Sequence, residues 1–304
     1  DAVLATRGNL NNDLGAPLTL LELGPEHKGA VIELGASRVG EIAYTVGLTR
    51  PQVAIITNAG TAHVGEFGGP EKIVEAKGEI IEGLGESGVA VLNLDDPAFA
   101  IWRARAGERS VLSFARHDQS ADFHARDLDR DARGCPSFTL HCADGQARIQ
   151  LNLLGEHNVS NALAAAAAAH VLCVPLVDIK AGLERLQPVK GRAVAQLASN
   201  GIRVIDDTYN ANPDSVRAAI DVLYSLPSPR VLVLGDMGEV GNNGPAMHTE
   251  VGAYARTRGV DTLLTLGEAT RDSVLAFGQG ARHYDSPEQV CEALGKMNVA
   301  SLLV

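Results

Sequence analysis

The sequence has few cysteines, few aromatic residues and no long hydrophobic run. Only four of its 304 residues are cysteine and 4% are aromatic. The cysteines follow no C-x-x-C or finger-like spacing, so they indicate neither a zinc site nor a disulfide framework, and a reducing cytoplasm fits best. No apolar stretch approaches the roughly 20 residues that span a bilayer, and the first residues do not form a signal peptide. We expect a cytoplasmic protein without membrane insertion.

Positive charge is also scarce. Lys and Arg number 26 against 37 Asp and Glu, which gives a net charge of −11. This field repels phosphodiester backbones, and no basic patch offsets it locally, so the charge argues against nucleic-acid binding. A nucleotide remains possible because backbone amides, a metal ion and one or two basic side chains are enough to bind it. The length suits about two domains, and 45% hydrophobic residues can fill their cores.

Three common motifs of α/β enzymes are missing. The sequence contains no G-x-x-x-x-G-K-[ST], no G-x-G-x-x-G after a strand and no G-x-S-x-G. These absences argue against a complete P-loop, a dinucleotide fingerprint and a hydrolase nucleophile elbow within this chain.

Short apolar runs alternate with helical patterns, which predicts an α/β protein with mainly parallel sheets. In a first domain, residues 1–188, we expect strands at 30–34, 53–57 and 89–93, a helix at 71–84, a small antiparallel β insertion within 111–154 and a buried helix at 155–173. In a second domain, residues 189–304, we expect a doubly wound, Rossmann-like sheet. Its strands are predicted at 203–206, 230–234, 262–266 and 301–304, and its helices at 214–226, 247–258 and 287–297. Because the chain starts and stops on strand-like residues, we expect it to be a piece of a longer protein.

Polar residues follow two predicted strands of the first domain. Glu33 ends one strand, while Asn58 and His63 lie in the glycine-rich loop after the next. If these strands are neighbours, the three side chains meet at one sheet edge and could surround Mg²⁺ and a phosphate. A solvated strand-end acid and an exposed loop histidine are the alternatives.

Two helical positions also stand out. Lys77 lies inside a predicted helix beside Gly78, although a solvated lysine paired with a neighbouring glutamate is the more common explanation. His157, Asn158 and Asn161 stand at a helix start, where they suit a purine edge or a phosphate better than simple capping, which needs one residue.

The loop after the first strand of the second domain concentrates polar groups. Adjacent acids end a buried strand there, which favours a sugar hydroxyl or an amine as partner, and the next helix is expected to be capped near Asp214 or Ser215. The polar residues of this loop are Asp206, Asp207, Tyr209, Asn210 and Asn212. The segment LGDMGEVG, residues 234–241, ends the next strand in a similar way.

Eight segments occur in an order that resembles the Mur ligase family. They are GNLNNDLGAPLTLL, VIELGAS, ITNAGTAHVGEFG, EAKGEI, GEHNVSNALAAA, PVKGR, DDTYNANPDS and LGDMGEVG. The resemblance implies three domains: one for a UDP-sugar, a central ATPase domain with a P-loop, and a C-terminal Rossmann-like domain. This sequence matches only the part after the P-loop, so we expect the fragment alone to be inactive.

The resemblance implies an ATP-dependent ligase of peptidoglycan precursor synthesis. ATP would activate the terminal carboxylate of UDP-N-acetylmuramoyl-tripeptide as an acyl phosphate, which the amine of D-alanyl-D-alanine would attack. Such chemistry depends on charge neutralisation and positioning more than on acid–base groups. We expect a monomer by resemblance, and closure about the LQPVKGR linker, residues 186–192, would assemble the site.

The resemblance also implies roles for individual residues. Glu33 and His63 match Mg²⁺ ligands, and Lys77 matches a lysine that becomes carbamoylated and holds a second Mg²⁺. The remaining matches are His157, Asn158 and Asn161 for adenine, Arg192 for the phosphates, Asp207 for the ribose, Asn11, Asn12 and Asn58 for phosphates and the tripeptide carboxylate, and Tyr209, Asn210 and Asn212 for nucleotide and incoming dipeptide. The alternatives are a sister ligase, such as folylpolyglutamate synthase or the tripeptide-forming ligase, and a non-catalytic nucleotide-binding module.

Overall fold

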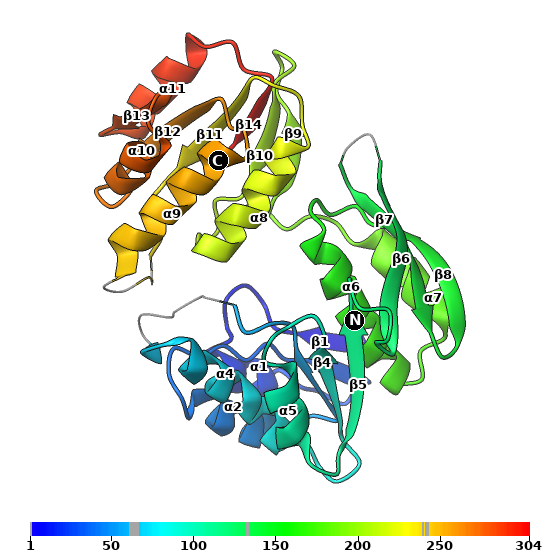
Figure 1. Cartoon of the computed structure of the whole chain (residues 1–304). Coiled ribbons are helices and arrows are strands. Elements are labelled where there is room, and N and C mark those ends of the chain that lie inside the picture. The colour runs from blue at the N-terminus through cyan, green and yellow to red at the C-terminus, as the bar shows by residue number, and fades with distance from the viewer. Residues whose placement is uncertain (1, 61–66, 132–133, 239, 241–242) are drawn as a thin grey trace.

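A computed structural model describes residues 2–60, 67–131, 134–238, 240 and 243–304. The chain forms two lobes, the first ending with α7 (Leu176–Arg185) and the second beginning with β9 (Val194–Leu197) (Figure 1). Each lobe is built around its own six-stranded sheet. The α/β architecture predicted from the alternation of strands and helices is therefore confirmed.

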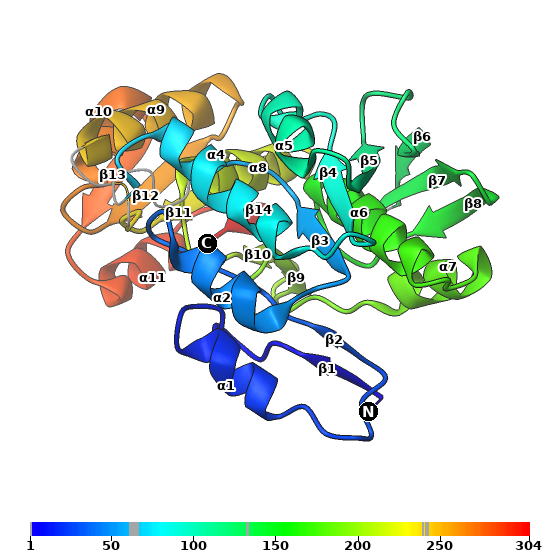
Figure 2. The same ribbon diagram turned by 90° about the horizontal axis from the view of Figure 1, so that it is seen from below.

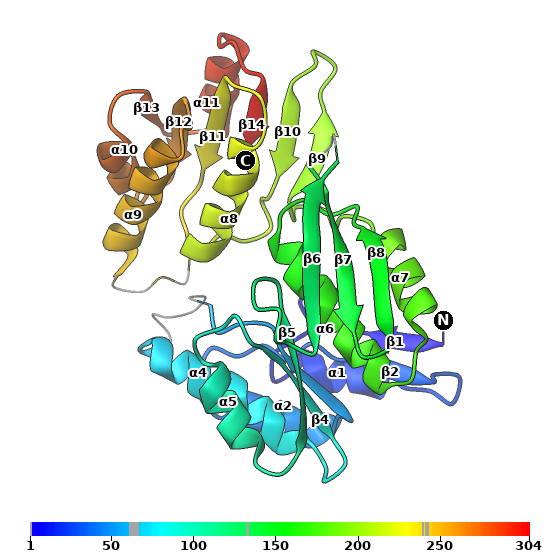
Figure 3. The same cartoon turned by 45° about the vertical axis from the view of Figure 1, so that its right-hand side comes forward.

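The sheet of the first lobe changes from parallel to antiparallel halfway across. Its order is β3 (Val53–Ile56), β4 (Val89–Asn93), β5 (Ser110–Ala115), β6 (Phe123–Arg130), β7 (Pro136–Cys142) and β8 (Gly145–Gln150). Strands β3 to β6 are parallel, whereas β6 to β8 are antiparallel and lie side by side in Figure 3. The expected antiparallel strands are present, but they extend the main sheet and do not form a separate insertion.

Helices cover both faces of this sheet because successive strand residues point to opposite sides. Val91 packs in one cluster with α6 (His157–Val171) and α7, while Ala90 and Leu92 pack in another. The second cluster includes η1 (Glu79–Gly83) and α5 (Phe99–Ala106). Helix α6, rich in alanine, is buried as its sequence predicts.

The expected helix at 71–84 is wrong in its second half. Helix α4 (Pro70–Gly78) gives way to the 3-10 helix η1. A Cβ on Gly78 would lie 2.7 Å from Arg105 Nη1 and 3.1 Å from the Trp102 ring, so the glycine allows α5 to approach closely.

The strands that carry Glu33 and Asn58 are not neighbours, contrary to the expectation from their order. Strand β2 (Gly29–Val31) pairs with β1 (Val3–Ala5) in a separate two-stranded sheet, and β3 pairs with β4. Helix α1 (Gly15–Leu21) lies between these two strands in the sequence, and α2 (Glu41–Thr49) follows them. Figure 2 shows β1, β2 and α1 apart from β3. Consecutive strands are often adjacent, but α2 here leads from one sheet into another.

The second lobe is a doubly wound sheet, as predicted. Its order is β13 (Ala281–Tyr284), β12 (Thr262–Leu266), β11 (Arg230–Leu234), β14 (Ser301–Leu303), β10 (Arg203–Asp206) and β9, with only β9 antiparallel to its neighbour. Leu232 and Leu263 pack with α8 (Pro213–Tyr224) and α9 (Gly244–Thr257) on one face, whereas Val231 and Leu264 pack with α11 (Pro287–Gly295) on the other. Helix α10 (Arg271–Phe277) lies against α9.

The two lobes meet through apolar side chains. Cys135 and Leu154 belong to the first lobe but are buried in the cluster formed by α8 and its sheet. Gly155 also lies against α8, since a Cβ there would be 3.4 Å from Val222. The start of α6 is therefore at the junction of the lobes. No helix within the described ranges is long and apolar enough to span a bilayer.

Candidate functional site

Lys77 is held by the loop that follows β3. Its Nζ donates hydrogen bonds to the carbonyl oxygens of Asn58, at 2.9 Å, and Ala59, at 2.6 Å. Burial lowers the pKa of Lys77, while the carboxylates of Asp96 and Asp214 act in the opposite direction. The alternative of a lysine paired with a neighbouring glutamate is not what the structure shows. That description fits Lys72, which lies 2.7 Å from Glu75 on the exposed face of α4.

The turn after β4 fixes the loop that holds Lys77, and the sequence analysis missed it. Asn93 Nδ2 donates to the Thr57 carbonyl at 2.8 Å, and Asp96 Oδ2 accepts the Ala59 N–H at 2.7 Å. The segment NLDDP carries the same signal as the other candidate loops, namely polar residues at the carboxyl end of a parallel strand. Applying that rule to β4 would have found these residues.

Glu33 and Asn11 come together beside β1 and β2. Asn11 Nδ2 donates to Glu33 Oε1 at 2.8 Å, and the Glu33 N–H donates to Thr6 Oγ1 at 2.8 Å. Asn12 has a different role, because its Oδ1 accepts the N–H groups of Leu14 and Gly15 at the start of α1. His63 lies outside the described residues.

The polar residues at the start of α6 bond to one another. Asn158 Nδ2 donates to the Leu154 carbonyl at 2.8 Å and lies 3.1 Å from His157 Nε2, while Asn161 Nδ2 donates to Asn158 Oδ1 at 3.2 Å. None of these three side chains caps α6 in the described structure, so simple capping does not explain them. Desolvation by the surrounding protein lowers the pKa of His157, and the positive charge of Arg116 lowers it further.

The linker and the loop after β10 form a third group. The Arg192 guanidinium lies 4.4 Å from the centre of the Tyr209 ring, a cation–π contact. Asp207 Oδ1 accepts the Ala193 N–H at 3.0 Å, and the Tyr209 N–H donates to the Gly191 carbonyl at 3.0 Å. Burial raises the pKa of Asp207, against the opposing effects of the Ala193 hydrogen bond and Arg192. The three residues assigned to nucleotide binding here are thus close together.

Two asparagines of this loop have local partners. Asn212 Oδ1 accepts the Ser215 N–H at 3.0 Å, and Ser215 Oγ accepts the Asn212 N–H at 3.0 Å, which is a capping box. The expected cap at Asp214 or Ser215 is therefore wrong by two or three residues. Asn210 Oδ1 accepts the Ala211 N–H at 2.8 Å. In the LGDMGEVG segment, Asp236 Oδ1 accepts the Thr270 N–H at 3.0 Å.

The donor set suits Mg²⁺ only in one chemical form. The described residues contain no group of three or more His, Cys, Asp or Glu side chains that could hold a metal ion. Glu33 is an exposed carboxylate, the ligand type that Mg²⁺ prefers. Lys77 as an ammonium would repel the ion, whereas a carbamate on the same nitrogen would offer oxygen ligands. The lowered pKa of Lys77 supports that form, because CO₂ reacts with the neutral amine.

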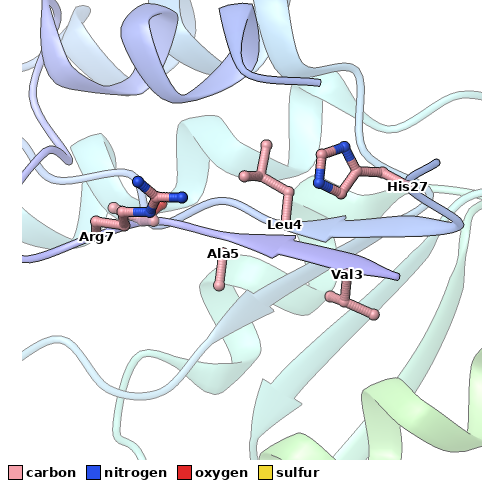
Figure 4. Close-up of a pocket in the computed structure, with 6 residues that line it drawn as sticks. Val3, Leu4, Ala5, Arg7 and His27 are labelled. Atoms are coloured by element: carbon pink, nitrogen blue, oxygen red, sulfur yellow. The ribbon is translucent and has the colours of Figure 1, made fainter. Parts of the chain in front are cut away.

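A hollow of about 350 Å³ lies along strand β1, and Thr6, whose hydroxyl accepts the Glu33 N–H, is one of its lining residues. Figure 4 shows Leu4 and His27 on one side of the strand and Val3 and Ala5 on the other. Such alternation marks an edge strand and not a concave ligand site. Of the candidate residues, those at the start of α6 lie at the junction of the two lobes.

Two family models together match most of the chain. The Mur ligase middle domain matches residues 1–169, and the Mur ligase, glutamate ligase domain matches residues 185–301. The chain belongs to the Mur ligase family. Among its relatives, UDP-N-acetylmuramoyl-tripeptide--D-alanyl-D-alanine ligase of Escherichia coli is 44% identical over 93% of this chain and 62% of its own length. The enzyme of the same name from Haemophilus influenzae is 40% identical over 97% of this chain and 63% of its own length.

Solved Mur ligase structures agree with the fold of both lobes. MurF from Acinetobacter baumannii has a TM-score of 0.93 at 38% identity and covers 99% of this chain and 66% of its own. MurF ligase from Thermotoga maritima in complex with ADP has a TM-score of 0.86 at 26% identity. The match covers 99% of this chain and 69% of the Thermotoga maritima chain. Folylpolyglutamate synthase of Mycobacterium tuberculosis, at 19% identity and a TM-score of 0.69, shares the fold alone. The chain thus spans less than two thirds of the length of the first relatives it matches.

Proposed function

We propose that this chain is the catalytic part of an ATP-dependent ligase that joins D-alanyl-D-alanine to UDP-N-acetylmuramoyl-tripeptide in the cytoplasm. The observation that carries the proposal is the 44% identity, over 93% of the chain, to a relative named for this reaction. The sister ligases are weaker candidates, because the diaminopimelate ligase and folylpolyglutamate synthase structures are each 19% identical to this chain.

The reaction transfers a phosphoryl group and then forms an amide. The tripeptide carboxylate attacks the γ-phosphorus of ATP and releases ADP, leaving an acyl phosphate. The dipeptide amine then attacks the acyl carbon, the tetrahedral intermediate expels phosphate, and the nitrogen loses a proton. Neither step needs a protein nucleophile, so alignment and charge neutralisation supply most of the rate enhancement.

The residues of this chain divide these tasks between the lobes. Two Mg²⁺ ions, when bound by Glu33, His63 and a carbamate on Lys77, would neutralise phosphate charge. Arg192 would contact the phosphates, Asp207 the ribose, and Tyr209 the nucleotide. His157, Asn158 and Asn161 would bind the adenine edge, whereas Asn11, Asn12 and Asn58 would orient the acyl phosphate, and Asn210 and Asn212 the incoming dipeptide. We place the domain boundary between residues 188 and 189 and propose that the protein acts as a monomer.

The position of Lys77 supports its proposed modification. Two backbone carbonyls align its nitrogen, and burial favours the neutral amine. The amine attacks the carbon of CO₂ and loses a proton, and the resulting carbamate carries the negative charge that a cation requires.

Phosphate release from ATP by the full-length gene product tests the function. We expect release only when UDP-muramoyl tripeptide and D-alanyl-D-alanine are both present. Lys77→Ala should lower the rate by at least about 100-fold, and short carboxylates should restore part of it. Lys72→Ala is the matched control on the same helix and should retain wild-type activity. Substrate-independent release would indicate an ATPase without ligase activity, and absent release would favour a non-catalytic nucleotide-binding module; either result would contradict the ligase proposal.

A further inference from the structure

Two adjacent acids in the turn between β4 and α5 hold different loops. Asp96 Oδ2 accepts the Ala59 N–H at 2.7 Å, and its Oδ1 accepts the Ala98 N–H at 2.8 Å. Asp95 Oδ2 accepts the N–H groups of Arg116, at 2.7 Å, and His117, at 3.1 Å. The two carboxylates therefore connect the end of β4 to the loops that leave β3 and β5.

The loop held by Asp96 is the one that positions Lys77. The carbonyls of Asn58 and Ala59 accept the hydrogen bonds of Lys77 Nζ, and the N–H of Ala59 is bound by Asp96. Asn93 adds a second anchor through the Thr57 carbonyl. A shift of this short loop moves the two acceptors that fix the Lys77 nitrogen.

The loop held by Asp95 leads to the start of α6. The Arg116 side chain extends to Glu156 Oε2 at 3.3 Å, and Glu156 is the residue immediately before His157. Arg130 reaches the other oxygen of Glu156 at 2.6 Å. Asp95 thus fixes the backbone from which Arg116 reaches the beginning of the helix that carries His157 and Asn158.

We propose that Asp95 and Asp96 are positioning residues with separate tasks: Asp96 orders the Lys77 side of the site, and Asp95 orders the nucleotide side at α6. The hydrogen bonds of both carboxylates go to backbone N–H groups, so each carboxylate positions the loop that it binds, and the charge of Asp96 additionally acts on Lys77. This inference rests on the proposed function for the roles of Lys77 and α6, but the hydrogen bonds of the two carboxylates do not depend on it.

Replacing either acid with asparagine removes acceptors without removing volume. An amide keeps one acceptor oxygen and directs its NH₂ group at a backbone N–H, which loosens the loop. In hydrogen exchange of the full-length protein, Asp96→Asn should speed exchange at residues 57–60 and leave 116–118 unchanged. Asp95→Asn should do the reverse. This readout does not require ligase activity.

Kinetics and calorimetry test the functional consequence. Asp96→Asn should lower kcat on the order of 100-fold, through misplacement of Lys77, with ADP affinity within about threefold of wild type. Asp95→Asn should weaken ADP binding about tenfold, measured by calorimetry, and leave kcat at saturating ATP within about threefold. Asp261→Asn is the matched control. Asp261 likewise accepts a backbone N–H, that of Arg230 at 2.7 Å, but lies in the second lobe.

Two further variants guard against loss of folding. Asn93→Asp removes the Nδ2 donor to the Thr57 carbonyl but keeps the oxygen that accepts the Asp95 N–H, so it should reproduce the Asp96 effects. Arg116→Met removes the contact with Glu156 and should reproduce the ADP effect of Asp95→Asn. The proposal is overturned if either substitution speeds hydrogen exchange in both loops alike. It is also overturned if one substitution lowers kcat and ADP affinity together, as a general loss of stability would. A wild-type protein without substrate-dependent phosphate release would refute the proposed function, while exchange and ADP affinity would still decide this inference.

Discussion

At the residue scale, three titratable side chains of the candidate site have shifted pKa values. Burial is the largest cause for each one: it lowers the pKa of Lys77 and His157 and raises that of Asp207. Desolvation always disfavours the charged form, so the direction of each shift follows from the type of group. The three groups come from α4, α6 and the loop after β10, so the shifts occur in both lobes.

The lowered pKa of His157 predicts a pH dependence of stability. The unfolded histidine titrates near its ordinary value of 6.5, above the value in the folded chain. As the pH falls from above 6.5 toward the lower pKa of the folded chain, the unfolded state binds more protons than the folded state. The free energy of unfolding therefore decreases. Urea unfolding from about pH 8 to pH 5 should therefore show a smaller loss of stability for His157→Gln than for wild type. Parallel curves for the two proteins would contradict the shift.

At the element scale, helix starts decide how several candidate residues are used. Asn12 binds the first N–H groups of α1, and Asn212 forms a capping box with Ser215 at the start of α8. Free N–H groups at a helix start need acceptors, and asparagine is among the best. A motif residue can thus serve the helix first, and its side-chain NH₂ group remains for a ligand.

Asn212→Ala should destabilise the protein by about 1 kcal/mol, because the first turn of α8 loses an acceptor for the Ser215 N–H. Asn210→Ala is the control. Within the described residues, the Asn210 side chain hydrogen-bonds only to the N–H of its neighbour Ala211, so we expect a change within about 0.5 kcal/mol. Chemical denaturation measures both values. An Asn212→Ala protein of unchanged stability but reduced affinity for the dipeptide would show that binding outweighs capping.

At the scale of the whole molecule, the end of the linker between the lobes is bonded to the second lobe. Gly191 accepts the Tyr209 N–H, the Ala193 N–H binds Asp207, and Arg192 stacks on Tyr209, so residues 191–193 move with the second lobe. Helix α7 ends at Arg185 in the first lobe. A change in the angle between the lobes is therefore expected to occur within residues 186–190.

Closure about this pivot is a testable expectation for the full-length protein. Lys77 and Asp214 already interact electrostatically across the lobes, and bound substrates would add contacts to both sides. Small-angle scattering with nucleotide and both substrates should give a smaller radius of gyration than without them. Gly191 has a φ of +75°, and a Cβ there would lie 3.2 Å from the Tyr209 backbone nitrogen. Gly191→Ala should therefore change the size of this decrease in the radius of gyration. Identical scattering curves would contradict closure.

Local sequence patterns were enough to predict the class of the fold and many of its strands and helices. Alternating apolar runs identified β4, β10, β11 and β12 and the helices α8, α9 and α11 of the second lobe within a few residues, because periodicity and turn chemistry are local properties, but they did not identify α10. The sequence also located the loops at strand ends where polar residues gather. The ordered motifs indicated the Mur ligase family, which two family models then confirmed.

Tertiary structure alone decided which of these loops meet and what each side chain binds. Periodicity could not reveal that β2 and β3 belong to different sheets, or that Gly78 allows α5 to approach closely, because both depend on contacts distant in sequence. It could not give Lys77 two carbonyl partners or Asp95 and Asp96 two separate loops. Hydrogen-bond partners and desolvation are set by three-dimensional neighbours, whereas the strand and helix patterns are set by residues close in the chain.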